Sequence, residues 1–283
     1  MARPVRNPAP LAYVAEGALL HPSVEVHAGA WIGAEVELAA GVVVGPGAVL
    51  GFADRTRRVA APVERPDPEG PAPTVRRAEA VRPPPETRPE GPAERVRVGE
   101  GAYLGPGVHL EPGVEIGPRS AVESGSILRR GTRVGGDVYV GPRCVIMGHC
   151  TIQDYVSLFA EVHVCPYALL QSHCQVMPGV KLLNDPCPPT GLDLRGPTIG
   201  PCAVLGVNAV IWSGVHVGCH AIVAAASVVK QNVPDYVLVG GSPAKPLCDT
   251  RWIRVQLRDR WVYPYPWTRW GIEGEDVTRP EPR

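Results

Sequence analysis

From Val98 to Leu182 the sequence repeats an aliphatic residue every six positions without interruption. An amphipathic helix repeats its apolar face every 3.6 residues and a half-buried strand every two. Six is a multiple of two, so each six-residue unit, or hexad, can hold one short strand and one corner. A repeat of this length predicts a parallel β-helix, in which short strands stack coil upon coil. The fifteen aliphatic positions are Val98, Leu104, Leu110, Ile116, Val122, Leu128, Val134, Val140, Ile146, Ile152, Leu158, Val164, Leu170, Val176 and Leu182.

Two further positions of the hexad are restricted. The fourth residue after each aliphatic one, the small slot, is never larger than Val between Ala102 and Val180. The third residue after each aliphatic one, the turn slot, is often Gly, which suits a backbone that turns with positive φ. The residue directly after the aliphatic one is also often Gly. Three of the eight cysteines, Cys144, Cys150 and Cys174, fall in the small slot. There they act as compact apolar side chains, and with no C-x-x-C pair we expect no metal site.

The hexads also set the domain boundaries. Seven hexads from Val14 to Leu50 and six from Ile199 to Val229 bring the total to 28, about nine coils if three hexads make a turn. Stacked strands about 4.8 Å apart give a prism about 45 Å long. We expect N-terminal coils over 12–51, a central β-helix over 97–183 and C-terminal coils over 199–246.

Three segments depart from the repeat. Residues 52–96 hold ten prolines and cannot bury a core, so they form a loop insertion that is either solvated or a lid. The repeat resumes in phase after them, as it would if the loop left one corner of a continuous helix. Residues 184–198 form a shorter Pro-rich loop. The tail, 247–283, carries four of the six tryptophans, which fits a cap on the open end of the helix or, alternatively, a surface that stacks on a ligand ring.

Charge and hydropathy bound the partners. The 28 basic and 28 acidic residues give no net charge, so no field recruits nucleic acid or an anionic membrane. The chain has no apolar run of 18 residues, and its first residues lack the apolar core of a signal peptide. We therefore expect a cytoplasmic protein with no nucleic-acid or membrane partner.

Residues 197–245, PTIGPCAVLGVNAVIWSGVHVGCHAIVAAASVVKQNVPDYVLVGGSPAK, resemble the C-terminal signature of hexapeptide-repeat acyltransferases. The repeat itself predicts a β-helix, and the resemblance alone implies that its hand is left. It also implies a homotrimer that binds acetyl-CoA or another acyl thioester in grooves between neighbouring prisms. By the same resemblance, the groups that contact acyl-CoA are Val207, Ala225, Lys230, Gln231 and Lys245. Residues 224–227, A-A-A-S, replace the usual G-A-G-S of that signature.

The loop LNDPCPPTG (183–191) resembles the T-N-D-x-x-P loop of nucleotide-sugar N-acyltransferases. Asn184, Asp185 and Pro188 match that pattern, while Leu183 replaces its Thr. In those enzymes the loop overhangs the acceptor. The resemblance therefore implies that Asn184 and Asp185 bind an amino sugar, one linked to a nucleotide.

His149 is the candidate general base. Its segment MGHCTIQD resembles the H-D-C-x-I-G segment that carries the basic histidine of related acyltransferases, although His149 lies one slot nearer to the next aliphatic residue, Ile152. A histidine with a pKa near neutrality can take the proton of an attacking amine. The alternative is a solvated turn histidine, because some sugar N-acyltransferases of this family use no protein base.

Three other functions stay open. The chain could acylate a different small acceptor, such as an amino acid or a sugar hydroxyl. It could be a metal protein like the γ-type carbonic anhydrases, although their H-x4-H pair is absent and His216 and His220 lie four residues apart. It could also be a non-catalytic β-helix scaffold.

Overall fold

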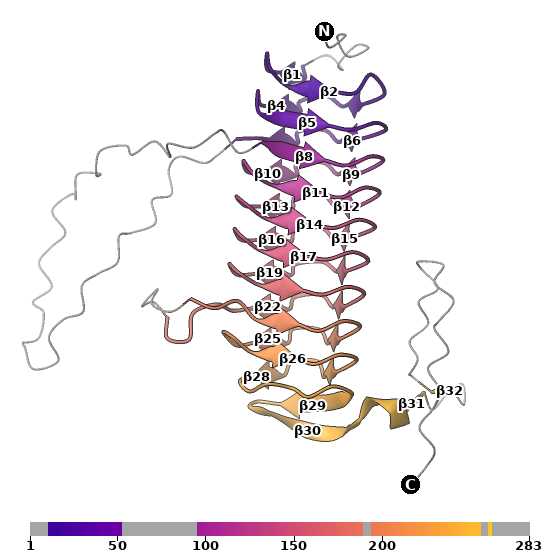
Figure 1. Cartoon of the computed structure of the whole chain (residues 1–283), viewed down its shortest axis with the longest axis vertical. Coiled ribbons are helices and arrows are strands. Elements are labelled where there is room, and N and C mark those ends of the chain that lie inside the picture. The colour runs from indigo at the N-terminus through magenta and orange to yellow at the C-terminus, as the bar shows by residue number, and fades with distance from the viewer. Residues whose placement is uncertain (1–10, 53–94, 189–193, 256–259, 262–283) are drawn as a thin grey trace, which may run out of the picture.

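The computed structural model describes residues 11–52, 95–188, 194–255 and 260–261. Within them the chain forms a left-handed parallel β-helix (Figure 1). Three long sheets, here A, B and C, hold ten, nine and eleven strands, and the only helix among these residues is the short 3-10 helix η1 (Thr250–Trp252). The predicted fold class is confirmed.

The strands of each sheet are as follows. Sheet A contains β1 (Tyr13–Val14), β4 (Trp31–Ile32), β7 (Val49–Leu50), β10 (His109–Leu110), β13 (Ile127–Leu128), β16 (Val145–Ile146), β19 (His163–Val164), β22 (Lys181–Leu182), β25 (Val210–Ile211) and β28 (Val228–Val229). Sheet B contains β2 (Leu19–Leu20), β5 (Val36–Leu38), β8 (Val96–Val98), β11 (Glu115–Ile116), β14 (Arg133–Val134), β17 (Thr151–Ile152), β20 (Leu169–Leu170), β23 (Thr198–Ile199) and β26 (His216–Val217). Sheet C contains β3 (Glu25–Val26), β6 (Val43–Val44), β9 (Tyr103–Leu104), β12 (Ala121–Val122), β15 (Tyr139–Val140), β18 (Ser157–Leu158), β21 (Gln175–Val176), β24 (Val204–Leu205), β27 (Ile222–Val223), β29 (Val237–Gly241) and β30 (Ala244–Asp249), and β31 (Arg254–Val255) pairs with β32 (Arg260–Trp261) separately.

The register shows that one coil takes 18 residues, or three hexads. Tyr13 lies beside Trp31 and Val14 beside Ile32, and the same offset recurs between Ile127 and Val145. Each aliphatic position is the last residue of a strand from β1 to β28, so the 28 predicted hexads make nine full coils and one further strand. Because successive residues of a strand point to opposite faces, the aliphatic residue fills the core and the residue before it faces out.

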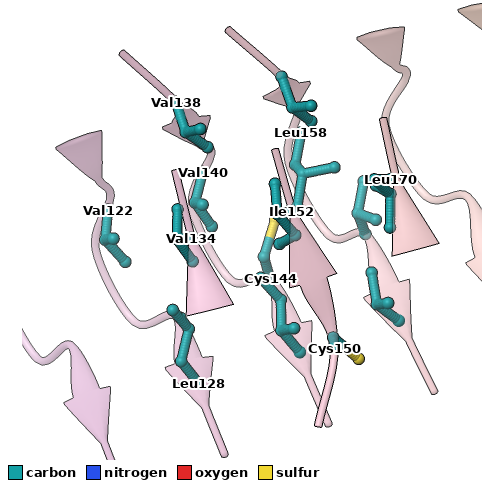
Figure 2. Packing of buried hydrophobic residues seen from close by; sticks show 14 of the residues in the cluster. Val122, Leu128, Val134, Val138, Val140, Cys144, Cys150, Ile152, Leu158 and Leu170 are labelled. Carbon is teal, nitrogen blue, oxygen red and sulfur yellow. The ribbon is translucent and has the colours of Figure 1, made fainter. Parts of the chain in front are cut away.

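The small slot is the second layer of the core. Cys144, Cys150 and Cys174 are fully buried there, and Figure 2 shows Cys144 and Cys150 packed among the aliphatic side chains of neighbouring coils. Burial disfavours the thiolate; it raises the pKa of Cys144 to about 11 and that of Cys150 to about 12. These cysteines are inert core residues, as their slot predicts.

Polar side chains also occupy the small slot, and two of them, Ser126 and Ser120, are satisfied in the same way. Ser126 Oγ donates to the carbonyl of Gly141 at 2.9 Å and accepts from the amide of Cys144 at 3.0 Å. Ser120 repeats both contacts one hexad earlier. A buried hydroxyl is stable only when it is hydrogen-bonded, so the adjacent coil makes serine tolerable in this core.

Between Val98 and Leu182 the turn slot adopts the left-handed conformation whatever residue fills it. Gly101 and Gly107 have φ of 65° and 64°, but His149 and Tyr167 have φ of 61° and 68°. The glycines directly after the aliphatic residue have a different cause. A Cβ on Gly117 would lie 2.3 Å from the carbonyl carbon of Gly135 in the next coil, so close approach of the coils, not positive φ, requires glycine there.

The three corners of the prism are named here by the sheets that they join. Both breaks in the repeat occur at the A–B corner, the first between β7 and β8 and the second between β22 and β23. In Figure 1 the described ends of both breaks lie on the same side of the prism. Since β8 pairs with β5 in register, Val36 beside Val96, the coil closes across the first break. Residues 53–94 and 189–193 lie outside the described residues.

The outer faces of sheets A and B differ in character. Sheet B carries an ion-pair ladder in which Arg97 lies 2.9 Å from Glu115, and Glu115 lies 3.6 Å from Arg133. The outward side chains of sheet A are mostly apolar or aromatic: Tyr13, Trp31, Val49, His109, Ile127, Val145, His163, Lys181, Val210 and Val228. One face of the prism is therefore far less polar than its neighbour.

The C-terminal end is partly covered by the hairpin β29–β30 and by η1. β29 adds to the end of sheet C beside β27, and the buried Thr250 Oγ1 donates to the carbonyl of His220 at 3.1 Å. The predicted capping by the rest of the tail falls on residues outside the described part. No helix among the described residues is long and apolar enough to span a bilayer.

Candidate active site

His149 lies at the A–B corner, between the two breaks in the repeat. It fills the turn slot, is exposed, and its ring stacks on the ring of Tyr167 one coil further on, with centroids 5.9 Å apart. On its other side lies Gly131, where a Cβ would come within 2.8 Å of His149 Nδ1. The ring is thus held flat between a glycine and a tyrosine, with its edge open to solvent.

The same stacking occurs at the B–C corner. Tyr155 stacks on His173 at 4.8 Å, and His220 stacks on Tyr236 at 5.2 Å. Burial lowers the pKa of both histidines, an effect that Asp154 and Asp235 partly oppose. Stacked rings are therefore what the turn slot imposes on flat side chains one coil apart, and the stack alone does not mark His149 as catalytic.

The loop that carries Asn184 and Asp185 begins and ends at the A–B corner. The amide of Arg195 donates to the carbonyl of Asn184 at 2.8 Å, which closes the neck of the loop. The hydroxyl of Ser213, in the next coil, lies 3.0 Å from the carbonyls of both residues. Asp185 Oδ1 accepts from the amide of Cys187 at 2.9 Å, so this carboxylate also holds the loop in a turn.

Lys230 and Gln231 lie at the same corner, directly after β28, and both are exposed. The ammonium of Lys230 sits 4.9 Å from the centre of the Trp212 ring, which fixes its direction along the corner. Trp212 itself packs partly into the core. The sequence analysis did not single out Trp212, Ser213, Arg195 or Tyr167. Trp212 and Ser213 directly follow the aliphatic Ile211. Their place at a corner of the repeat is the sequence feature that could have indicated them.

Val207, Ala225 and Lys245 belong to a different edge of the prism. Val207 and Ala225 lie at the C–A corner in adjacent coils, and the amide of Ala226 donates to the carbonyl of Val207 at 2.8 Å. Lys245 lies in β30 opposite Gly240. Val207 is 43% exposed. The structure thus groups His149, Asn184, Asp185, Lys230 and Gln231 at one edge of sheet A, and Val207, Ala225 and Lys245 at its other edge.

The remaining histidines show no metal-like cluster. His216 faces outward from sheet B, while the His220 ring stacks at the B–C corner. His163 faces outward from sheet A, where burial and then the charge of Lys181 lower its pKa. In the part of the chain that the structure describes, no three His, Cys, Asp or Glu side chains are placed to hold a metal ion.

Residues 95–130 match a family model described as bacterial transferase hexapeptide (six repeats). A 2,3,4,5-tetrahydropyridine-2,6-dicarboxylate N-acetyltransferase of Clostridium perfringens is 46% identical over 57 residues, 18% of this chain and 24% of that protein. The enzyme of the same name from Staphylococcus aureus is 55% identical over 42 residues, 15% of this chain and 18% of that protein. The chain thus spans a quarter or less of the length of these curated relatives.

Among solved structures, UDP-N-acetylglucosamine acyltransferase from Campylobacter jejuni is similar with a TM-score of 0.47 and 16% identity. That match covers 85% of this chain and 73% of the other. So weak a likeness carries no argument about function. The family model and this chain share the hexapeptide repeat. The resemblance to hexapeptide-repeat acyltransferases that the sequence indicated is therefore confirmed for the repeat.

Proposed function

We propose that this hexapeptide-repeat protein is an acetyl-CoA-dependent N-acyltransferase that acts on an amino sugar linked to a nucleotide. The observation that carries the proposal is the A–B corner. In every second coil it holds an exposed imidazole at His149 after β16, the pinched loop at Asn184 after β22 and the cation of Lys230 after β28. Coils stack about 4.8 Å apart, so these three groups extend over about 19 Å of the corner, a length that an acceptor and an acyl donor bound end to end can cover.

The active unit in this proposal is a homotrimer with sites between subunits. On one prism the residues assigned to acyl-CoA lie partly at the C–A corner (Val207, Ala225, Lys245) and partly at the A–B corner (Lys230, Gln231), the two edges of sheet A. A groove between two copies would bring one edge of each together. The apolar outer face of sheet A favours it as the contact, because burying apolar area stabilises association and burying the ion pairs of sheet B would not.

The chemistry needs a base, a positioned thioester and donors for the oxyanion. In the proposal His149 takes a proton from the acceptor amine as its nitrogen attacks the thioester carbonyl carbon. The resulting oxyanion collapses, the C–S bond breaks, and the departing CoA thiolate receives the proton held by the imidazolium. The products are the amide and free CoA, so no oxidant or metal is required.

A second acceptor class is favoured by the curated relatives, whose printed names describe an N-acetyltransferase acting on tetrahydropyridine-2,6-dicarboxylate. Because their names describe this substrate, a small dicarboxylate is the leading alternative to the amino sugar, although the match to this chain is short.

The test is a binding measurement followed by a panel of acceptors. Isothermal titration calorimetry of the full chain with acetyl-CoA should show binding, and no heat at millimolar ligand would overturn the acyltransferase proposal. Release of CoA would then be followed with nucleotide-linked amino sugars, the same sugars without the nucleotide, and tetrahydropyridine-2,6-dicarboxylate. Turnover with the dicarboxylate alone would reject the amino sugar while keeping N-acyl transfer.

A further inference from the structure

The neck of the loop 184–195 is tied to the next coil by one hydroxyl. Asn184 and Arg195 lie 11 positions apart in the sequence yet meet through the hydrogen bond from the Arg195 amide to the Asn184 carbonyl. Ser213 Oγ lies 3.0 Å from both of their carbonyl oxygens. The amide of Gly214 also donates to the Arg195 carbonyl, at 2.9 Å. Both ends of the loop are therefore attached to the segment 213–214.

The Ser213 hydroxyl has one proton and so donates to one carbonyl at a time. Each carbonyl has two lone pairs and already accepts one backbone amide, so the hydroxyl supplies the remaining partner of either. Without it, the neck keeps its backbone bonds but loses the group that fixes the distance between its two strands and the next coil. A loss of this kind loosens the neck and leaves the coil intact.

The same hexad slot at another corner provides a comparison. Ser172 follows Leu170 by two residues, as Ser213 follows Ile211, but it lies at the B–C corner, where no loop leaves the prism. Its hydroxyl contacts the side chain of Gln153 at 3.4 Å. A serine in this slot therefore does not always contact two backbone carbonyls. It does so at Ser213, where the ends of a loop lie beside it.

We propose that Ser213 is a positioning residue that sets the orientation of Asn184 and Asp185 toward the acceptor. This inference rests on the proposed function, because it assigns the loop to acceptor binding. Ser213 acts through the loop and touches neither reacting group. Its removal should therefore weaken acceptor binding and leave acyl-CoA binding unchanged, because Val207, Ala225 and Lys245 lie at the other edge of sheet A and Lys230 packs on the Trp212 ring, not on the loop.

The kinetic test compares Ser213→Ala, Ser213→Thr and Ser172→Ala in the full chain. A neutral hydrogen bond contributes about 0.5–1.5 kcal/mol, so Ser213→Ala should raise the acceptor KM by about 3- to 10-fold with the acetyl-CoA KM unchanged. Ser213→Thr, which keeps the hydroxyl, should restore the wild-type value, and Ser172→Ala should match wild type. Equal acceptor KM values for Ser213→Ala and Ser172→Ala would overturn the inference, as would an equal rise in the acetyl-CoA KM.

A second measurement does not depend on activity. Hydrogen–deuterium exchange should be faster at the Arg195 amide in Ser213→Ala by about 3- to 10-fold, since opening of the neck becomes easier, and unchanged in Ser172→Ala. Unaltered exchange at Arg195 would show that the hydroxyl does not hold the neck. If the wild-type chain transfers no acyl group but the exchange result holds, the proposed function fails and the anchoring role of Ser213 stands without its link to an acceptor.

Discussion

The A–B and B–C corners are two edges of the same prism with the same backbone, yet they carry different features. Both place a histidine and a tyrosine in stacked turn slots, His149 with Tyr167 at one edge and His173 with Tyr155 at the other. Only the A–B corner is interrupted by the two loops, whereas the B–C corner continues from coil to coil. The stacked rings follow from the fold alone, whereas the two loops distinguish the A–B corner, where we propose the active site.

The difference between the two corners is tested most strongly by replacing His149 and His173 by Ala in two separate variants. If His149 is the base, His149→Ala should lower kcat by about 10²- to 10⁴-fold, and His173→Ala should leave kcat near wild type. Steady-state rates at saturating acetyl-CoA and acceptor measure both. Wild-type kcat in His149→Ala would mean that the amine arrives already deprotonated. An equal loss in both variants would mean that stacking, not proton transfer, is what activity needs.

For the tyrosines of the two corners we compare stability, and here the larger loss is expected at the B–C corner, from Tyr236→Ala, and the smaller at the A–B corner, from Tyr167→Ala. Tyr236 stacks on His220, and the guanidinium carbon of Arg251 lies over the Tyr236 ring, 4.7 Å from its centre. Tyr236→Ala removes one ring pair and one cation–π contact, about 2 kcal/mol of the free energy of unfolding. Tyr167, 52% exposed, should lose less than about 1 kcal/mol on replacement by Ala. Urea unfolding of both variants tests the order, and a larger loss for Tyr167→Ala would contradict it.

The repeat predicted the architecture well because its cause is local. A strand of two residues needs one inward aliphatic side chain, and a small slot beside it admits Cys144 or Ser126 but nothing larger than Val. Every later coil repeats this demand, so the 28 strands, the buried cysteines and the return of register after the first loop could be derived from spacing alone. The large excursion altered none of it, since β8 pairs with β5 regardless of the residues between.

The site could be predicted only in part, because its geometry depends on contacts between coils. The resemblance selected His149 and Lys230, but it could not say that Val207 lies at a different corner from them. Nor could spacing reveal the Ser213 bridge, which joins residues 29 and 18 positions apart. Such contacts follow from which loop leaves which corner, and a one-dimensional repeat treats its three corners alike.

A matched pair of glycines sharpens the comparison further. Gly131 and Gly101 have φ of 68° and 65° at the A–B and B–C corners, so replacing either by Ala should reduce the free energy of unfolding by about 1 kcal/mol. They differ in their neighbours. A Cβ at 131 would meet His149 Nδ1 at 2.8 Å, while one at 101 would meet Arg119 at an ordinary 3.8 Å. Gly131→Ala should therefore also displace the imidazole and lower kcat by about tenfold. Equal kcat in the two variants would show that the position of the His149 ring does not matter.

The smallest effect expected is a pH dependence of stability from the B–C corner. Burial lowers the pKa of His173 and His220 in the folded chain, so below the ordinary value of about 6.5 the unfolded chain binds protons that the folded chain does not. Stability should therefore be full above about pH 6.5 and fall as the pH drops toward the folded values.

The double variant His173→Phe/His220→Phe keeps two flat rings in the column but removes both titrations. Its free energy of unfolding, measured in urea from pH 8 down to pH 5, should decline less than that of the wild type, and the decline that remains is expected from His163, whose pKa burial also lowers. Glu161 and Asp249, whose pKa values are lowered by Arg143 and Arg251, lose their contribution only at more acidic pH, below the ordinary carboxyl values of about 4, and do so in both proteins. A slope as steep in the double variant as in the wild type would show that His173 and His220 at the B–C corner do not cause the pH dependence of stability.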